Sequence, residues 1–389
     1  MEHVLNDANF TSKEWKPLPI SLLNEYETSM QEETNKQHAQ EIRKQIESYF
    51  NYSSFDASIE KITIGGIFTK FTFKCNPSLE RRHILRMNDD MLEKFGNQGM
   101  YLTNIDESNH TFDLEIENET VQTFSLRDIY SSLTYLDEEK LLFGLGKTVE
   151  GCIAFVDLRQ VEHVLINDTL GCGSTIFIQS IITTLLMRNS ADDMKFVLID
   201  SNTNSFRYFN DVPHLLEPIT SDINETKRII EKLHNELELR YDIFSKYHQR
   251  DIDEYNEDAD SLELDKMPYI VVFINDLAPF IKHGDILSSI FGLMVRGKYA
   301  GINVIARTTC DIGRCLYNCF PTRIAFKTNG IGLINTEDEK HLFRYHDMLV
   351  KSRKVMDGRA LRLQSCFVHR KEIERVVNYY RNVNSANGD

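Results

Sequence analysis

The stretch HVLINDTLGCGSTIFIQ, residues 163–179, decides the fold of this 389-residue chain. It opens with a short continuous apolar run, which is typical of a strand buried on both faces. Gly171 and Gly173 then mark a tight turn, and the apolar segment from Thr175 to Met187 predicts a buried helix. A strand that passes through a glycine turn into a helix is the repeating unit of ligand-binding α/β folds.

Runs of the same kind recur further along the chain. They are KFVLID (195–200), YIVVFIN (269–275), INVIA (302–306) and TRIAF (322–326). Helical segments separate the earlier runs, for instance at 175–187 and 222–246. Buried strands separated by helices predict a parallel, doubly wound α/β sheet, whose ligands bind at the carboxyl ends of the strands. The loop after HVLIN lies at one of these ends.

This loop has the frame of a phosphate-binding loop. In the pattern G-x-x-x-x-G-K-[ST], backbone N–H groups hold the phosphates, the lysine reaches the β and γ oxygen atoms, and the hydroxyl holds magnesium. The frame here runs from Asp168 to Thr175. It predicts phosphate contacts from Gly171, Cys172, Gly173, Ser174 and Thr175, with Thr175 as the candidate magnesium ligand.

Two positions depart from that pattern. Ser174 stands in place of the lysine, and Asp168 stands in place of the first glycine. A charged hydrogen bond contributes about 1.5–3 kcal/mol, and about 1.4 kcal/mol is a tenfold change in affinity. We therefore expect the missing lysine alone to weaken triphosphate binding by about one to two decades.

The strand at 269–275 shows a related departure. Phosphoryl-transfer enzymes of this kind place an acid that holds magnesium at the end of such a strand, followed by a catalytic carboxylate. This chain has Asn275 and Asp276 there, and Asn275 carries no charge. Asp276 is a candidate for polarising a water molecule, and a purely structural role at the strand end is the alternative. A GKT sequence at residues 146–148 has no buried apolar strand leading into it, and we expect a turn there.

The N-terminal third of the chain has a different pattern of apolar and polar residues. Residues 1–30 predict an extended lead-in. Helical spacing at residues 31–50 and 78–95 and the alternating segments IFTKFTFKC and TFDLEIE predict a small α/β domain over residues 31–140. The larger sheet is then expected over residues 141–389.

Charge is unevenly distributed along a chain whose net charge is -15. Residues 251–265 carry eight acids and no base, which predicts a solvated surface loop. Residues 351–371 carry seven Lys or Arg and one acid, and among them Lys351, Arg353 and Lys354 are candidate contacts to a DNA backbone. A solvated strand edge is the alternative. No run of eighteen apolar residues occurs and the N-terminus has no export signal, so we expect a cytoplasmic protein without a membrane segment.

Taken together, these segments resemble the motor portion of the FtsK/SpoIIIE family of DNA translocases. The resemblance begins near Lys16, covers nearly the whole chain and rests on the order of many pieces. In chain order these are KPLPISLL (16–23), FGLGKTVEGCIAFVDL (143–158), the phosphate loop, VPHLL (212–216), ELELRYDIF (236–244), PYIVVFIND (268–276), KYAGINVIA (298–306), PTRIAF (321–326), HDMLV (346–350) and a final helix near residues 370–380.

The resemblance implies a RecA-like P-loop NTPase fold, a hexameric ring around double-stranded DNA, and ATP with Mg²⁺ as cofactors. It also marks further departures. Thr308 and Thr309 stand where the family has Gln and Arg of a sensor, and Lys298 stands where it has an Arg near the subunit boundary. The sequence therefore retains the segments that specify the family's fold, whereas the residues at its catalytic positions are replaced.

Three hypotheses for function follow. The first is a pseudo-ATPase subunit that packs into a homo-oligomeric ring, or into a mixed ring with an active paralogue, with DNA as its partner and weak or no ATP binding. The second is an active ATP-dependent DNA translocase whose lysine and acids are replaced from elsewhere. The third is a coupling or scaffold protein for conjugation, packaging or secretion, which binds protein and which the acidic net charge favours.

Overall fold

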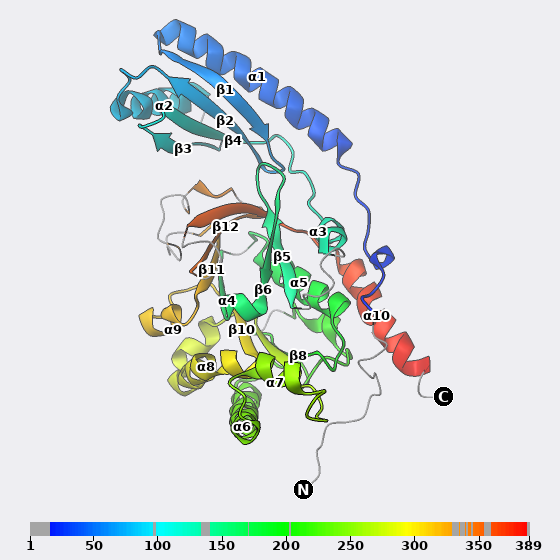
Figure 1. Ribbon diagram of the computed structural model, residues 1–389. Coiled ribbons are helices and arrows are strands. Elements are labelled where there is room, and N and C mark those ends of the chain that lie inside the picture. The colour runs from blue at the N-terminus through cyan, green and yellow to red at the C-terminus, as the bar shows by residue number, and fades with distance from the viewer. Residues whose placement is uncertain are drawn as a thin grey trace.

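The computed structural model describes residues 16–95, 99–133, 141–169, 171–201, 204–328, 334, 339, 341–343, 345–353 and 359–386. Their strands form two sheets, one of four strands and one of nine. Figure 1 shows the smaller sheet beside the long helix α1 (Ser29–Ser53) at one end of the molecule, and the larger sheet with most of the helices beyond it.

The smaller sheet is antiparallel, in the order β1-β2-β4-β3. Its strands are β1 (Ala57–Ile64), β2 (Phe68–Cys75), β3 (Met100–Asp106) and β4 (Thr111–Glu117), and its helices are α1 and α2 (Arg81–Phe95). Phe73 and Phe112 stack with ring centroids 4.8 Å apart in the core between the sheet and the helices. Because apolar residues alternate along β2 and β4, one face of the sheet forms this core.

The larger sheet has the order β6-β5-β13-β12-β11-β7-β10-β9-β8. Five neighbouring strands in this order, from β11 to β8, are parallel. They are β7 (Val164–Asn167), β8 (Met194–Ile199), β9 (Tyr269–Ile274), β10 (Ile302–Thr308) and β11 (Thr322–Phe326). The continuous apolar runs of the sequence therefore form the parallel strands, as expected.

Helices cover both faces of this parallel part. Val271 and Phe273 of β9 pack in one core, whereas Ile270 and Val272 pack in another, because successive strand residues point to opposite faces. The first core includes residues of α3 (Leu126–Leu133), α5 (Ser174–Arg188) and α10 (Arg370–Ala386), and the second includes residues of α6 (Ile223–Tyr247) and α8 (Gly284–Gly297). This arrangement is the expected doubly wound α/β architecture.

The sheet as a whole is mixed, because further strands extend its predicted parallel part. The strands β12 (Asp347–Ser352), β13 (Ala360–Ser365), β5 (Leu142–Lys147) and β6 (Ile153–Asp157) extend it with antiparallel pairing. Two local expectations are wrong. Gly146 and Lys147 end strand β5 and do not form a turn, because they pair with β13 and β6. The acidic segment contains a helix, α7 (Ile252–Asp258), which Asp251 caps through its bond from the Glu254 backbone N–H.

The lead-in segment runs alongside α10, as Figure 1 shows where η1 (Ile20–Leu22) lies beside that helix. Arg375 Nε donates to the Leu22 carbonyl at 2.7 Å, and the Asn24 backbone N–H donates to Glu372 Oε1 at 2.7 Å. The remaining short elements are α4 (Leu158–Val161), η2 (Arg207–Phe209), η3 (Ala278–Lys282), η4 (Lys298–Ala300) and α9 (Arg314–Asn318). None of the helices in the described ranges is long and apolar enough to cross a lipid bilayer.

Candidate nucleotide site

The predicted phosphate loop lies between the end of β7 and the start of α5, and Leu170 within it lies outside the described residues. Gly171 and Gly173 have φ of +90° and +103°, a region that residues with a Cβ rarely adopt. A Cβ at Gly173 would also lie 3.3 Å from Nδ1 of His346. Among the described residues, no other backbone group accepts a hydrogen bond from the backbone N–H groups of Gly171, Cys172 and Gly173.

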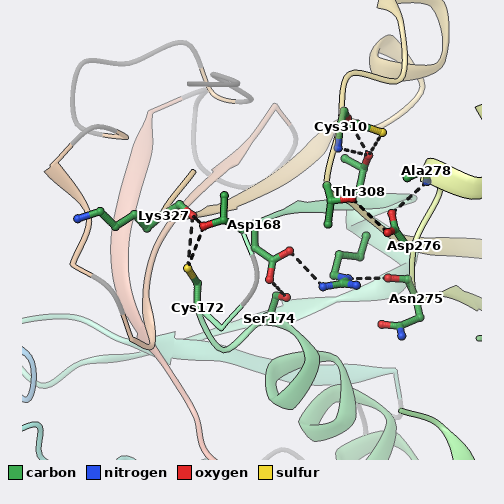
Figure 2. A network of polar contacts seen from close by, with 12 residues as sticks. Asp168, Cys172, Ser174, Asn275, Asp276, Ala278, Thr308, Cys310 and Lys327 are labelled. Carbon is green, nitrogen blue, oxygen red and sulfur yellow. Dashed lines mark hydrogen bonds and ion pairs between the residues drawn. The ribbon is translucent and has the colours of Figure 1, made fainter. Parts of the chain in front are cut away.

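The two remaining residues of the predicted phosphate contact are at the start of α5. Ser174 is fully buried, and Thr175 beside it in the first turn is half-buried. Cys172 is buried, and its Sγ lies 3.5 Å from the Lys327 carbonyl oxygen. Figure 2 shows the Lys327 side chain extending away from the loop, so that this lysine contributes only its carbonyl here.

The residue in the lysine position is turned into the protein. The Ser174 hydroxyl donates a short hydrogen bond to Oδ2 of Asp168, the residue in the first-glycine position (Figure 2). Oδ1 of the same carboxylate pairs with Nη1 of Arg307 at 3.2 Å. The side chains of Asp168 and Arg307 are 2% and 4% exposed, so this is a buried ion pair. Burial raises the pKa of Asp168, and the Arg307 charge opposes that rise.

Arg307 connects this carboxylate to the next part of the site. Its Nε donates to the Asn275 carbonyl oxygen at 2.6 Å. Asn275 is fully buried, and its side-chain Nδ2 donates to Oδ1 of Asp200 at 2.9 Å. Asp200 Oδ2 in turn accepts from the Phe206 backbone N–H at 2.9 Å. Ser174, Asp168, Arg307, Asn275 and Asp200 therefore form one chain of bonds across the carboxyl ends of four neighbouring strands, which we call the buried polar network.

Both carboxylate oxygens of Asp276, the candidate catalytic acid, bind groups of the protein. Oδ1 accepts from the Ala278 backbone N–H at 3.0 Å, and Oδ2 accepts from the Thr309 hydroxyl at 3.1 Å (Figure 2). The Thr308 hydroxyl donates to the Cys310 carbonyl at 2.8 Å. Asp276 and the two threonines at the sensor positions thus form local turns at the ends of β9 and β10.

The other candidate residues lie elsewhere. Lys298 pairs with Glu162 at 3.1 Å and begins η4, before the amino end of β10, so it is at the opposite edge of the sheet from the phosphate loop. Lys351 is half-buried on β12, and Arg353 is exposed in the turn that follows. Lys354 lies outside the described residues.

Sequence reasoning missed Arg307 and Asp200. Both were visible as charged residues directly after apolar runs, in INVIAR and KFVLID, where the strands of a parallel sheet present ligand-binding groups. Neither position stood out in the patterns used for prediction, because those patterns describe the residues that contact phosphate and metal. The described residues contain no group of three or more His, Cys, Asp or Glu side chains placed to hold a metal ion.

With this geometry in place, comparisons with known proteins identify the relatives of the chain. A model of the FtsK/SpoIIIE family matches residues 126–357. The DNA translocase FtsK of Oceanobacillus iheyensis is 27% identical over 379 residues, which cover 93% of this chain and 48% of that protein. The chain thus spans about half the length of the curated relatives it matches.

Solved structures show the same fold at low identity. The pCW3 conjugation coupling protein TcpA, in its monomer form with ATPγS, is 14% identical with a TM-score of 0.59, and the match covers 86% of this chain and 97% of that one. The cytoplasmic domain of the Thermomonospora curvata type VII secretion ATPase EccC is 16% identical with a TM-score of 0.55, and covers 62% of this chain and 31% of that one.

Proposed function

Because the chain belongs to the FtsK/SpoIIIE family, we propose that it is a pseudo-ATPase relative of the DNA translocases. It keeps a ring-forming, DNA-associated motor fold and has lost efficient ATP hydrolysis. The observation that carries this proposal is the buried polar network, in which the polar groups beside the phosphate loop are bonded to one another.

The charges of the network argue against phosphoryl transfer. Catalysis of that reaction depends almost entirely on positioning and on neutralising the charge of the phosphates. The lysine position holds Ser174, whose hydroxyl is bound to Asp168, and the nearest cation, Arg307, is paired with the same carboxylate. No cation of the network is therefore left over for the γ-phosphate.

Family membership implies ATP with Mg²⁺, and the two parts of that cofactor fit differently. The positive φ angles of Gly171 and Gly173 suit a loop that brings its backbone close to phosphates. Mg²⁺ prefers carboxylate and water oxygen ligands. Here the end of β9 holds the neutral amide of Asn275, and the carboxylates of Asp200 and Asp168 are bonded to Asn275 and Arg307. The nucleotide thus fits the loop in part, and the metal does not fit the donor set.

An oligomeric ring is part of the proposal, either of this chain alone or with an active paralogue. Phe291, Val295 and Tyr299 recur four residues apart along α8 and η4 and are 40%, 52% and 51% exposed. An apolar stripe of this kind is typical of a protein interface. It supports assembly with further subunits, and Lys351, Arg353 and Lys354 remain the proposed DNA contacts.

The alternative that a specific observation favours is a coupling or scaffold protein. The net charge of -15 opposes association with a phosphate backbone. The fold is shared with a conjugation coupling protein and a secretion ATPase. On this alternative the cargo is protein, and the basic segment near β12 is a solvated strand edge.

ATP turnover measured with and without duplex DNA tests the proposal. We expect no DNA-stimulated hydrolysis above the background of a matched Gly173→Asp preparation, whose carboxylate would repel phosphate. A DNA-stimulated rate that disappears in Asp276→Asn would establish the active translocase instead. Retention on duplex DNA that falls with salt and is lost when Lys351, Arg353 and Lys354 are changed to Glu would favour a nucleic-acid role over the protein scaffold.

A further inference from the structure

We infer that Arg307 takes the place of the divalent metal, so that the site accepts a polyphosphate anion without Mg²⁺, with Asp168 as the internal anion that competes for Arg307. This inference rests on the proposed function, since it concerns the same site. It goes further by naming the ionic form of the ligand and the residue that limits its binding.

The position of Arg307 is the first argument. It is the penultimate residue of β10, the strand next to β7, and pairs across the sheet with Ile166, two residues before Asp168. Its guanidinium reaches both the phosphate-loop side, at Asp168, and the end of β9, at Asn275. A metal held between a phosphate loop and the neighbouring strand end would be expected in this region of a P-loop enzyme.

The balance of charge is the second argument. Within the buried polar network Arg307 is the one cation, and Asn275 offers a neutral amide where a magnesium-binding acid is expected. A buried guanidinium repels a divalent cation and attracts phosphate oxygen atoms, with which it can form paired hydrogen bonds. Its Nε donates to the Asn275 carbonyl oxygen and its Nη1 to Asp168, so the guanidinium lies between the phosphate loop and the end of β9.

Asp168 binds both Arg307 and Ser174 and so keeps them from other partners. One of its oxygens pairs with Arg307 and the other accepts from Ser174, so a single carboxylate occupies both groups that a phosphate would otherwise meet. The desolvation that raises the pKa of this acid also makes its negative charge costly to bury without Arg307. A phosphate at the loop must therefore compete with Asp168 for the same guanidinium.

The loop supplies the remaining donors. The first backbone N–H groups of the 15-residue helix α5 have no acceptor within the helix and no side-chain cap, and the positive φ angles of Gly171 and Gly173 suit a close approach of the backbone to an anion. These donors have no requirement for metal, and they act together with the guanidinium once Asp168 is neutral. The backbone N–H groups and Arg307 thus provide the affinity for an anion, and Asp168 lowers that affinity by competing for Arg307.

The test is binding of ATP and of inorganic tripolyphosphate, measured by calorimetry and by thermal stabilisation, in EDTA and in Mg²⁺. For the natural sequence we expect weak, millimolar binding that Mg²⁺ does not strengthen. Asp168→Asn should bind at least about tenfold more tightly in EDTA. Asp168→Asn with Arg307→Met should lose that gain.

Controls separate this effect from general loss of stability. Glu236→Gln removes the charge of the acid that pairs with another buried arginine, Arg240 on α6, and should leave anion binding unchanged. If Asp168→Asn does not fold, the inference is tested by the natural sequence alone, through the comparison of anion binding in EDTA and in Mg²⁺. Binding that requires Mg²⁺, no binding at millimolar anion, or a folded Asp168→Asn without the gain would each overturn the inference.

Failure of this inference and failure of the proposed function have different signatures. Mg²⁺-dependent binding without turnover would remove the role given to Arg307 and leave the pseudo-ATPase proposal in place. DNA-stimulated turnover would remove the pseudo-ATPase proposal, whatever the metal dependence of binding.

Discussion

His214 shows how one buried side chain makes stability depend on pH. It is fully buried, and its Nε2 lies 2.9 Å from the Asn189 carbonyl oxygen. Burial lowers the pKa of His214 from 6.5 to about 4. Between these values the unfolded chain binds a proton that the folded protein excludes, so the stabilisation present above pH 6.5 is lost as the pH falls toward 4.

We expect His214→Gln to be less stable than the natural sequence at neutral pH and less sensitive to acid. Between about pH 7.5 and pH 5, its free energy of unfolding should fall by about 2 kcal/mol less. Urea unfolding at the two pH values measures this difference. Phe209→Leu, at another fully buried site, should lose stability equally at both. An unchanged pH dependence in His214→Gln would contradict the assignment.

At the scale of single residues, the sequence predicted the phosphate loop but not the buried ion pair beside it. The glycine spacing was sufficient to locate the strand, the turn and the helix, since backbone conformation depends on local sequence. The Asp168–Arg307 pair joins residues 139 apart in the chain. No local pattern reports a contact at that separation, and only the strand order of the sheet brings the two residues together.

The hairpin between β1 and β2 shows a constraint at the scale of an element. Its turn residue Gly66 accepts a hydrogen bond from the Gln122 backbone N–H at 2.8 Å, and Gln364 of β13 donates to the Gln122 carbonyl at 2.7 Å. A Cβ at Gly66 would lie 2.1 Å from Gln364 Oε1. The tip of the small sheet is therefore packed against β13, and a side chain at this position would displace that of Gln364.

Gly66→Ala should displace Gln364 and lower the free energy of unfolding by about 1–3 kcal/mol. Gly284→Ala is the matched control, because a Cβ there would meet nothing within 4 Å and its φ is not in the left-handed region. Chemical denaturation of both variants measures the difference. Equal stability of the two would show that the hairpin tip tolerates a side chain.

The elements themselves were largely predictable. The sequence placed buried strands at 195–200 and 322–326 and a helix at 222–246, and the structure has β8, β11 and α6 within one residue of those bounds. The antiparallel extension of the sheet was not predicted, because hydrophobic periodicity identifies a strand and carries no information on its partner. Thus β5 and β13 pair across more than two hundred residues.

At the scale of the whole molecule, one arginine joins the two sheets. Arg362 of β13 pairs with Glu115 of β4 and, at 2.6 Å, with Asp347 of β12. Its guanidinium lies 4.2 Å from the ring centroid of Phe68. Glu115 of β4 is therefore buried at this junction, where it meets Arg362 of the larger sheet, whereas Glu117 at the end of the same strand is exposed.

Arg362→Met should lower the free energy of unfolding by about 3–5 kcal/mol, since it leaves Glu115 and Asp347 buried without a cation. Adding Glu115→Gln should recover part of this loss. Burial raises the pKa of Glu115 from 4.5 to about 7, with Arg362 opposing the rise. The folded protein thus holds a proton that the unfolded chain releases, and this group's contribution falls as pH rises from 4.5 through 7.

Urea unfolding across that pH range measures both effects. Glu115→Gln alone should remove the part of the pH dependence that Glu115 contributes. If Arg362→Met were as stable as the natural sequence, the junction between the sheets would not depend on this ion pair.

The pairing of β5 with β13 also constrains when the protein can fold during its synthesis. Gly146 pairs with Ser365, and Lys147 pairs with Gln364. The ribosome must therefore add more than two hundred residues before the first of these strands meets its partner. Until then β5 and β6 form an unprotected hairpin on the nascent chain, which is the kind of edge that molecular chaperones shield. The order of synthesis, and not the strength of the finished sheet, then sets the period in which this protein is most prone to aggregate.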